Sequence, residues 1–420
     1  MPFSMSKYSN EKPVAIVLGG TFPHIKLIEN LKKRGYCTIL VDYYENPSAK
    51  MAADEHFQES TLDMDKVVEI ARDRDAKLVI STCIDQANVT ACYVAEKLGL
   101  PAPYSYETSL AVTNKGLMKD CMVQNGIPTS KYVFIKDLSG FEYAGLKFPV
   151  AVKPADSNSS KGVRKACDLD ELGRFLDEAL KISRTNEAII EEYKEGREIG
   201  VDCVIKDKKA SVIMTRERRK VVSSGDPIQQ IQGSFWPADI TQSNIVALKR
   251  IAEDIADAFN LDNTPLMMQT IVNGDDINVI EFGARIGGGE NYQIIELHTG
   301  LDIIEVAIDS FLGCPLTFDY KAPANFYADI YLYTEPCIFG EFSGYEELVN
   351  TGVIEYLHVY KARGVEVGAE ISSNNRVGAF LVKSERIDEL YEKINIAIQK
   401  IETFDINGRP VLRKDIYCYG

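Results

Sequence analysis

Residues 188–205 (AIIEEYKEGREIGVDCVI) constrain the fold of this chain more than any other segment. An apolar run stops at Glu191-Glu192 and alternation resumes after Gly196, so the pattern predicts two strands joined by a short connection. Four glutamates lie within eight residues here, and such like charges repel unless water, a cation or hydroxyl donors offset the repulsion. The segment is therefore either an acidic hairpin at the surface or a connection whose carboxylates meet a ligand.

The length and charge of the chain limit its class. The 420 residues suggest about two to four domains. Hydrophobic residues make up 45% and charged residues 26%, as in a soluble globular protein with a large core. The formal net charge of −15 argues against non-specific nucleic-acid binding, which needs a basic surface. A nucleotide ligand is not excluded, because lysines and arginines can gather locally in an acidic protein.

The cysteines and the apolar runs indicate a compartment. Nine cysteines are scattered without a C-x-x-C pair, and several lie in apolar segments, so reduced core cysteines are expected. The N-terminal segment lacks the apolar centre of a secretion signal, and no apolar run reaches about 18 residues. We expect a cytoplasmic protein that neither enters a membrane nor binds nucleic acid.

Residues 13–110 alternate apolar runs with amphipathic segments, a pattern that predicts a parallel, doubly wound sheet. The turn Gly19-Gly20-Thr21 follows the first predicted strand. It is not a G-x-G-x-x-G fingerprint, and Asp42 alone is weak support for a dinucleotide. We expect a domain on the substrate side, in which the two glycines allow a small ligand to approach closely.

Lys115 lies in the first turn of the next predicted helix, which spans residues 114–124 and is capped by Gly126. A cation in the first turn opposes the helix dipole. Its placement indicates an anionic partner, unless it is an ordinary solvated lysine.

Residues 148–167 (FPVAVKPADSNSSKGVRKAC) predict a buried strand that delivers Lys153, followed by a small polar loop. The backbone N–H and hydroxyl groups of such a loop can bind phosphates, and its lysines add charge. The chain contains no G-x-x-x-x-G-K-[ST] motif, so this is not a Walker A loop. The alternative is a mobile surface loop.

Residues 209–220 (KASVIMTRERRK) predict a strand that ends in a basic cluster, with Arg216 and Arg218 near its end. This cluster is either a solvated turn or an anion site. Residues 265–272 and 277–282 then predict a hairpin through Asn273-Gly274-Asp275. Its second strand runs into VIEFGARIGGGEN (279–291), where Glu281 and Arg285 precede a triple glycine and a helix over 292–312, broken near Gly300.

Together these segments resemble the ATP-grasp enzymes, the fold shared by D-alanine–D-alanine ligase, carbamoyl-phosphate synthetase and L-amino-acid ligases. The spacing E-E-Y-x-x-G-x-E resembles their adenosine hinge. The segment 279–291 resembles the E-x-N-x-R-x-G motif and, more closely, the E-x-x-A-R form of amino-acid ligases. The resemblance runs in order over residues 111–315.

The resemblance implies roles for particular residues. Backbone groups of Glu192 and Lys194 would face adenine, with Glu191 and Tyr193 beside them, and Glu198 would accept the ribose hydroxyls. The phosphates would meet Lys115, Lys153 and the loop residues Ser159, Ser160, Lys161 and Gly162. Glu281 and Gln269 would hold Mg²⁺ or Mn²⁺, with Asn291 as a substitute ligand because Gly283 stands where many members carry an asparagine. Arg285 and Lys153 would act on the transferring phosphoryl group, and Arg216 and Arg218 on a carboxylate or acyl phosphate.

The implied fold class is mixed α/β and α+β. Residues 1–110 would form a Rossmann-like domain and residues 111–320 the ATP-grasp core. The core would divide into a small lobe at about 111–187 and a large lobe at about 188–320. Residues 321–420 would form a C-terminal α+β domain, as in many ATP-grasp ligases.

The implied activity is ATP-dependent ligation. A substrate carboxylate would attack ATP to give an acyl phosphate and ADP, and an amine or thiol would then displace phosphate. The partners would be small molecules, with a homodimer possible. Two alternatives stay open: a bicarbonate-using carboxylase or carbamoyl-phosphate-type enzyme, because Gln269 is the ligand type of that synthetase, and a catalytically silent nucleotide-binding module, because of Gly283.

Overall fold

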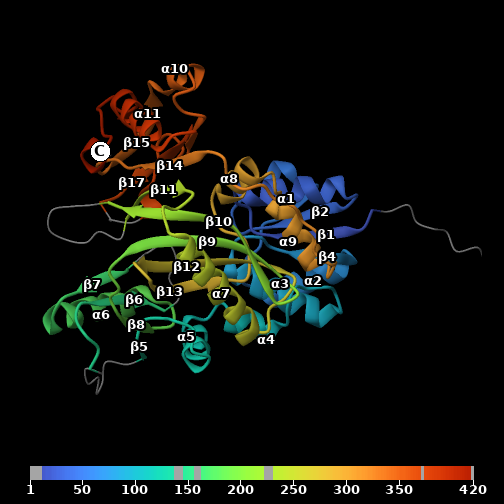
Figure 1. The fold of residues 1–420 in the computed structure, drawn as a ribbon. Coiled ribbons are helices and arrows are strands. Elements are labelled where there is room, and N and C mark those ends of the chain that lie inside the picture. Colours follow the sequence, from blue (N-terminus) through green and yellow to red (C-terminus); the bar gives the residue numbers. More distant parts are fainter. Residues whose placement is uncertain (1–11, 137–144, 156–161, 222–229, 370–372, 418–420) are drawn as a thin grey trace, which may run out of the picture.

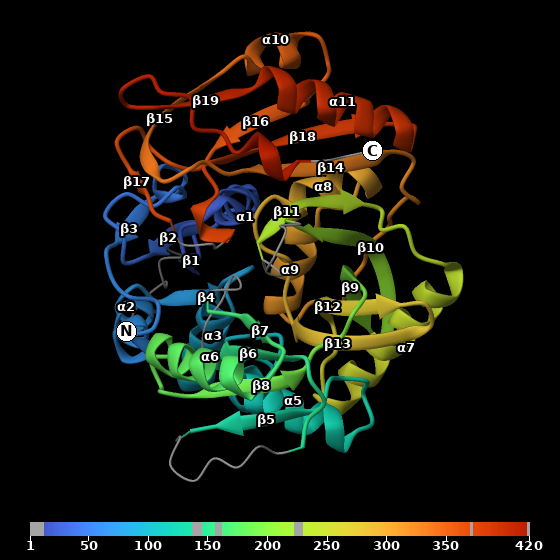
Figure 2. The same cartoon turned by 90° about the vertical axis from the view of Figure 1, so that its left-hand side faces the viewer.

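The computed structural model describes residues 12–136, 145–155, 162–221, 230–369 and 373–417. Within these ranges the strands form four sheets (Figure 1). The largest sheet runs through the middle of the molecule, with a small sheet at one end and the C-terminal strands at the other. The view in Figure 2 places helices α6 (Leu169–Ile182) and α11 (Ile387–Lys400) on opposite sides of it.

The N-terminal sheet is parallel, as predicted. Its strand order is β3-β2-β1-β4, with β1 at Val14–Leu18, β2 at Cys37–Val41, β3 at Glu55–Phe57 and β4 at Ala76–Ile80. Helices α1 (Phe22–Lys33), α2 (Met64–Asp73) and α3 (Asp85–Leu98) pack against it. Strands β1, β2 and β4 read as nearly continuous apolar runs because both faces of the sheet are buried.

The Gly19-Gly20 turn serves the chain's own packing. A Cβ at Gly19 would lie 2.6 Å from Ile84 Cδ1, and one at Gly20 would lie 2.4 Å from Pro47 Cβ. The prediction that these glycines let a ligand approach was therefore wrong, since side chains of the protein already fill the space.

The small-lobe sheet has the order β5-β8-β6-β7 and is antiparallel. Its strands are β5 (Tyr132–Ile135), β6 (Val150–Pro154), β7 (Arg164–Ala166) and β8 (Ala188–Glu192). Helix α6 covers it, and the side chain of its N-cap residue Asp168 accepts a hydrogen bond from Glu171 N at 2.9 Å. A compact apolar cluster joins the helix to the sheet.

The large sheet is antiparallel, in the order β13-β12-β9-β10-β11-β14-β18-β16. Its first five strands are β9 (Arg197–Lys206), β10 (Lys209–Lys220), β11 (Ile231–Trp236), β12 (Thr264–Asn273) and β13 (Asp276–Gly283). Helix α7 (Gln242–Ala258) covers one face, against Ile199, Val201 and Cys203 of β9. Strand alternation therefore turns Glu198, Gly200 and Asp202 to the other face.

Strands β8 and β9 do not pair. They belong to different sheets, and residues 193–196 cross from one to the other. Glu191 is 5% exposed and Glu198 is 8% exposed, so neither carboxylate lies on the surface. The surface-hairpin alternative is wrong.

Residues beyond 320 extend the same large sheet through β14 (Phe326–Leu332), β18 (Gly378–Ser384) and β16 (Tyr356–Val359). A three-stranded sheet, β17-β15-β19, and helices α10 and α11 pack beyond them. The bounds are β15 Cys337–Ser343, β17 Glu366–Val367, β19 Glu402–Asp405 and α10 Tyr345–Asn350. The small-lobe sheet includes β8, which lies past the predicted lobe boundary at residue 187. The large sheet continues past the predicted domain boundary at residue 320. The domain limits stay predictions.

The predicted helix after the triple glycine is broken, as expected. Helix α8 (Asn291–Thr299) ends at Gly300, whose φ of 74° suits glycine, and α9 (Ile303–Phe311) follows. Both helices share an apolar core with the N-terminal sheet. Arg34, the C-cap residue of α1, pairs with Glu305 and, at 2.6 Å, with Asp309, so ion pairs lie at the edge of that core.

The chain between the N-terminal sheet and the small lobe is helical. Helix α4 spans Tyr106–Ala111, and α5 spans Lys115–Gln124 with Asn114 as its N-cap. Within the described ranges no helix is long and apolar enough to cross a membrane.

Candidate active site

A cavity of about 800 Å³ lies between the small-lobe sheet and the large sheet. It is lined by residues from all the segments that the sequence singled out: Lys115, Lys153, Glu191, Glu192, Tyr193, Lys194, Glu198, Arg216, Arg218, Gln269, Glu281, Arg285 and Asn291. Gly162 does not line it, and a Cβ there would meet Pro154 and Ile182. Ser159, Ser160 and Lys161 lie outside the described residues.

Glu191 lies between two lysines at the small-lobe wall. Its carboxylate is 2.8 Å from Lys153 Nζ and 3.3 Å from Lys119 Nζ, and all three side chains are nearly buried. Burial alone would raise the pKa of Glu191, but the charges of Lys119 and Lys153 outweigh it and hold the pKa at about 2. Burial lowers the pKa of Lys119, and Glu191 opposes that effect. The pair of lysines thus places fixed positive charge beside an acid that stays ionised.

Glu192 ends β8, and Tyr193 and Lys194 begin the crossing between the sheets. The Glu192 side chain accepts a hydrogen bond from Lys147 N at 3.1 Å, and Lys165 Nζ lies 4.3 Å from the centre of the Tyr193 ring. Tyr193 N donates to Pro149 O at 2.9 Å. These contacts fix the backbone of the crossing against the small lobe.

Glu198 faces basic side chains of β10. Arg218 Nη1 donates to Glu198 at 2.6 Å and to Gln269 Oε1 at 2.8 Å, and Lys220 Nζ lies 3.3 Å from the same carboxylate. Burial would raise the pKa of Glu198, but Arg218 and Lys220 outweigh it and lower the pKa. Arg218 therefore bridges two residues that were predicted to bind ribose and metal.

Gln269 and Glu281 lie directly opposite each other on β12 and β13. Both line the cavity and offer oxygen atoms, which suit a hard cation such as Mg²⁺. Within the described ranges there is no group of three or more His, Cys, Asp or Glu side chains placed for a metal. A cation at this pair would need further oxygens from its ligand.

Asn291 lies at the start of α8 beside Asp202 and Arg216. Its Nδ2 donates to Asp202 Oδ1 at 2.8 Å, while its Oδ1 is buried without a hydrogen-bond partner among the described residues. Arg216 Nη1 is 3.8 Å from Asp202 Oδ2. Burial raises the pKa of Asp202 and Arg216 opposes it. The contact of Asn291 is thus with Asp202, and its role as a metal ligand stays a prediction.

Arg285 is held by Asp85, a residue that sequence reasoning missed. Its Nε and Nη2 donate to the two oxygens of Asp85, each at 2.6 Å. Burial would lower the pKa of Arg285, but Asp85 outweighs it and raises the pKa. A Cβ at Gly283 would lie 3.1 Å from Asp85 Oδ1 and 3.2 Å from Arg285 Cγ. This ion pair fills the space that an asparagine side chain at position 283 would need.

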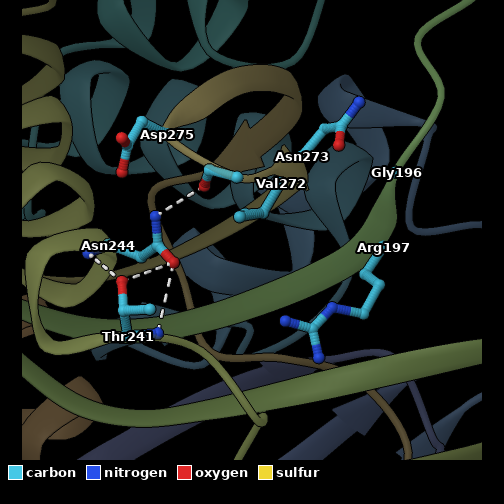
Figure 3. A pocket seen from close by; sticks show the side chains of 8 residues that line it. Gly196, Arg197, Thr241, Asn244, Val272, Asn273 and Asp275 are labelled. Carbon is cyan, nitrogen blue, oxygen red and sulfur yellow. Dashed lines mark hydrogen bonds between the residues drawn. The ribbon is translucent and has the colours of Figure 1, made fainter.

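A second, smaller pocket of about 260 Å³ lies at the β12–β13 turn (Figure 3). Asn244 there donates to Gly274 O at 2.9 Å and accepts from Thr241 N at 3.2 Å, and Arg197 lies on the far wall. None of the predicted site residues lines it, and its Thr241, Asn244 and Gly274 bond to one another. The large cavity is therefore the candidate site.

Parts of this chain are similar in sequence, and nearly all of it in structure, to known proteins. The family model for the C-terminus of D-ala D-ala ligase matches residues 122–228. The solved L-amino acid ligase from Bacillus licheniformis matches with a TM-score of 0.78 and 17% identity, covering 94% of this chain and 100% of that one. The phosphoribosylglycinamide synthetase from Anaerococcus prevotii matches with a TM-score of 0.73 and 19% identity, over 94% and 99% of the two chains.

This chain has the fold of the ATP-grasp ligases. Among curated relatives, the formate-dependent phosphoribosylglycinamide formyltransferase of Wolinella succinogenes is 25% identical over 243 residues, 56% of this chain and 60% of that protein. The chain spans between 11% and 60% of the length of the curated relatives that it matches. The predicted resemblance to ATP-grasp ligases and the mixed fold class are confirmed.

The ATP-grasp cavity also contains groups that the sequence did not reveal. Asp85, Glu290, Asp329, Tyr360 and Arg376 line it, and Lys119 lies behind its wall. Lys119 is four residues after Lys115, one helical turn on, and that spacing was the available signal. The others depend on contacts between distant segments, which a single sequence does not display.

Proposed function

We propose that this protein is an ATP-dependent ligase that activates a substrate carboxylate as an acyl phosphate and joins it to an amine or thiol. The observation that carries this proposal is the convergence of Lys153, Arg216, Arg285 and Glu281 in one cavity between two sheets. Phosphoryl transfer needs little covalent help from a protein, since positioning and neutralised charge supply most of the acceleration.

The chain's own residues divide the work. Lys115 and Lys153 would hold the phosphates from the small-lobe side, and Arg285, oriented by Asp85, would meet the transferring phosphoryl group from the large sheet. Glu281 and Gln269 would hold Mg²⁺, which neutralises phosphate charge. Glu198 would accept the ribose hydroxyls, a role that requires Arg218 to share or leave that carboxylate.

In the proposed reaction a carboxylate oxygen of the substrate attacks the γ-phosphorus, and the bond to ADP breaks. The nucleophile then attacks the acyl carbon, a carbon–nitrogen or carbon–sulfur bond forms, and phosphate leaves. Arg216, buried beside Asp202, would bind the carboxylate. The small-molecule partners, a cytoplasmic location and a homodimer belong to this proposal as predictions.

The test is to incubate the protein with Mg-ATP and pools of carboxylic acids and amines, and to measure ADP and phosphate release. Release that depends on an acid and an amine together supports ligation. Release that depends on bicarbonate instead would favour the carboxylase alternative. Nucleotide binding without release on any pool would favour the silent nucleotide-binding module.

Glu281→Gln should abolish turnover while nucleotide binding persists, because the amide lacks the charge that holds the cation on the phosphates. Turnover is measured as phosphate release and binding as the thermal shift caused by ATP. Glu217→Gln is the matched control, because Glu217 lies on the other face of the same sheet and does not line the cavity. Wild-type rates in Glu281→Gln would refute the assigned site.

A further inference from the structure

A glycine lies inside the buried strand β9. This residue, Gly200, has a φ outside the left-handed region that favours glycine. A glycine inside a strand weakens the strand, because it offers no side chain for packing and loses more conformational freedom on folding than other residues do. The backbone therefore does not require a glycine here, and the reason for it should lie in the space above the strand.

Gly200 belongs to one row of residues that crosses four neighbouring strands, β10, β9, β12 and β13 (Figure 1). It is directly opposite Arg216 of β10 on one side and Gln269 of β12 on the other, and Gln269 is opposite Glu281 of β13. Directly opposed residues turn their side chains to the same face of a sheet. The row thus places a gap between an arginine and the two residues proposed to hold Mg²⁺.

The side chain of Arg216 fills this gap. A Cβ at Gly200 would lie 2.7 Å from Arg216 Nε, 2.9 Å from its Cγ and 3.3 Å from its Cδ. Three successive atoms of the side chain thus lie above Gly200, so Arg216 leans across β9 in the direction of β12. Arg216 lines the cavity, whereas Gly200 below it does not.

The guanidinium of Arg216 lies between Asp202 and the glycine-rich loop. Its Nη1 is 3.8 Å from Asp202 Oδ2, and a Cβ at Gly287 would lie 3.3 Å from the same nitrogen. Asp202 is held in turn by Asn291, whose Nδ2 donates to Asp202 Oδ1 at 2.8 Å. The contact between Arg216 and Asp202 is too long for a hydrogen bond, so it orients the guanidinium without using its donors.

The neighbouring arginine is placed differently. Arg218 donates hydrogen bonds to Glu198 and to Gln269, so the chain's own acceptors engage this guanidinium. Both arginines are candidates for binding a carboxylate or an acyl phosphate. Arg216 is the better placed of the two, because an ion pair without a hydrogen bond orients it.

We propose that Gly200 is a positioning residue of the ligase. Its missing side chain lets Arg216 lie across β9, on the side of Gln269 and Glu281, where the acyl phosphate would form. A side chain at position 200 would turn Arg216 away from these two residues. The proposal rests on the proposed ligase function and adds the residue on which the placement of Arg216 depends.

The test is a double-mutant cycle of the wild type, Gly200→Ala, Arg216→Ala and the double variant. Phosphate release is measured with whichever pool of acids and amines supports turnover, and the melting temperature is measured with and without a non-hydrolysable ATP analogue. Gly173→Ala is the matched control, because Gly173 is exposed on α6 and a Cβ there would meet nothing within 4 Å.

We expect Gly200→Ala to lose about 100-fold in turnover, because small displacements of a group that acts on the reacting atoms are costly. The double variant should lose no more than Arg216→Ala alone, since the methyl group acts only through Arg216. The thermal shift caused by the ATP analogue should persist in all four proteins. That result would separate a misplaced Arg216 from a damaged nucleotide site.

The melting temperatures test the steric part without any substrate. In the wild-type background, Gly200→Ala should lower the melting temperature, because the methyl group displaces Arg216. In the Arg216→Ala background, the same change should leave it unaltered or raise it, because the space is then vacant and alanine restricts the unfolded chain. If Gly200→Ala alone does not fold, a folded double variant supports the proposal and an unfolded one counts against it.

Unchanged turnover in Gly200→Ala, or losses that multiply in the double variant, would overturn the proposal and leave the ligase function standing. Equal changes in melting temperature in both backgrounds would also overturn it. A wild type that releases no phosphate with any pool would instead refute the proposed function, while the melting temperatures would still decide whether Arg216 needs a glycine at position 200.

Discussion

At the scale of single residues, the decisive arrangement is an acid enclosed by two lysines. Glu191, Lys119 and Lys153 come from a strand, a helix and a second strand, and the acid stays ionised because the lysines offset its burial. The lysines in turn would repel each other without it. Breaking this group should strongly destabilise the fold, because the removal of one member leaves uncompensated buried charge.

Glu191→Gln should lower the free energy of unfolding by about 3 kcal/mol at neutral pH, as for other broken buried pairs. Denaturant unfolding measures this, with Glu192→Gln as the control, since the neighbouring Glu192 is only partly buried. The pKa of Glu191 is about 2 when folded, below its usual 4.5, so the unfolded chain binds more protons between these values. The wild-type advantage should therefore be full above pH 4.5 and vanish as the pH falls towards 2. A constant difference across that range would contradict this account.

The sequence predicted residues whose neighbours along the chain mark them. Lys153 before a proline, Glu281 and Arg285 before a triple glycine, and Glu198 after a crossing all follow local signals, and all line one cavity. Asp85 and Gly200 carry no such signal. Each matters through a group brought near by folding, Arg285 for one and Arg216 for the other.

At the scale of elements, the Arg285 site joins β13 to the first turn of α3. Asp85 begins α3 and follows β4, so the loop at the carboxyl end of a parallel strand reaches the nucleotide cavity. The two hydrogen bonds from Arg285 fix its guanidinium in one plane. The first residue of α3 thus orients a side chain that follows the last residue of β13 by two positions.

Asp85→Asn should reduce turnover by roughly 100-fold, because an asparagine cannot accept both hydrogen bonds and the guanidinium loses its orientation. Phosphate release is measured with whichever pool supports turnover, and the thermal shift with an ATP analogue should persist. Asp65→Asn, in the first turn of α2 and outside the cavity, is the control. Unchanged turnover in Asp85→Asn would show that Arg285 needs no such support.

Element boundaries follow from periodicity wherever the apolar pattern is strong. The predicted strand at 209–220 coincides with β10, and the break near Gly300 separates α8 from α9. The pairing of strands is harder to predict from the sequence. The segment 188–205 was compatible with a hairpin, but β8 and β9 pair with strands of two different sheets, and their glutamates are buried against lysines and arginines.

At the scale of the whole molecule, one eight-stranded sheet crosses the predicted domain boundary at residue 320. Strand β11 pairs with β14, and Phe235 belongs to the apolar cluster of the C-terminal strands. A sequence shows strands but not the sheet that each joins, so the C-terminal segment was expected as a separate domain. The boundary itself remains a prediction.

A chain that ends at residue 320 should fail to give a cooperatively folding, ATP-binding unit, because it exposes the edge of β11 and leaves Val221 and Phe235 without the rest of their apolar cluster. Size-exclusion chromatography and thermal unfolding measure this. The chain 1–417 is the control, since it keeps every strand of the sheet. A soluble, monomeric 1–320 that binds ATP would contradict the dependence and support the predicted boundary.

The glycine-rich loop at 287–289 has a mechanical consequence. Gly288 and Gly289 line the cavity, and helix α8, which starts two residues later, packs in the apolar core of the N-terminal sheet. A ligand that moves this loop must also move α8, or the packing of α8 must resist the movement. A ligand that displaced this loop would therefore also shift α8 and, through it, the apolar core of a sheet built from the other end of the chain.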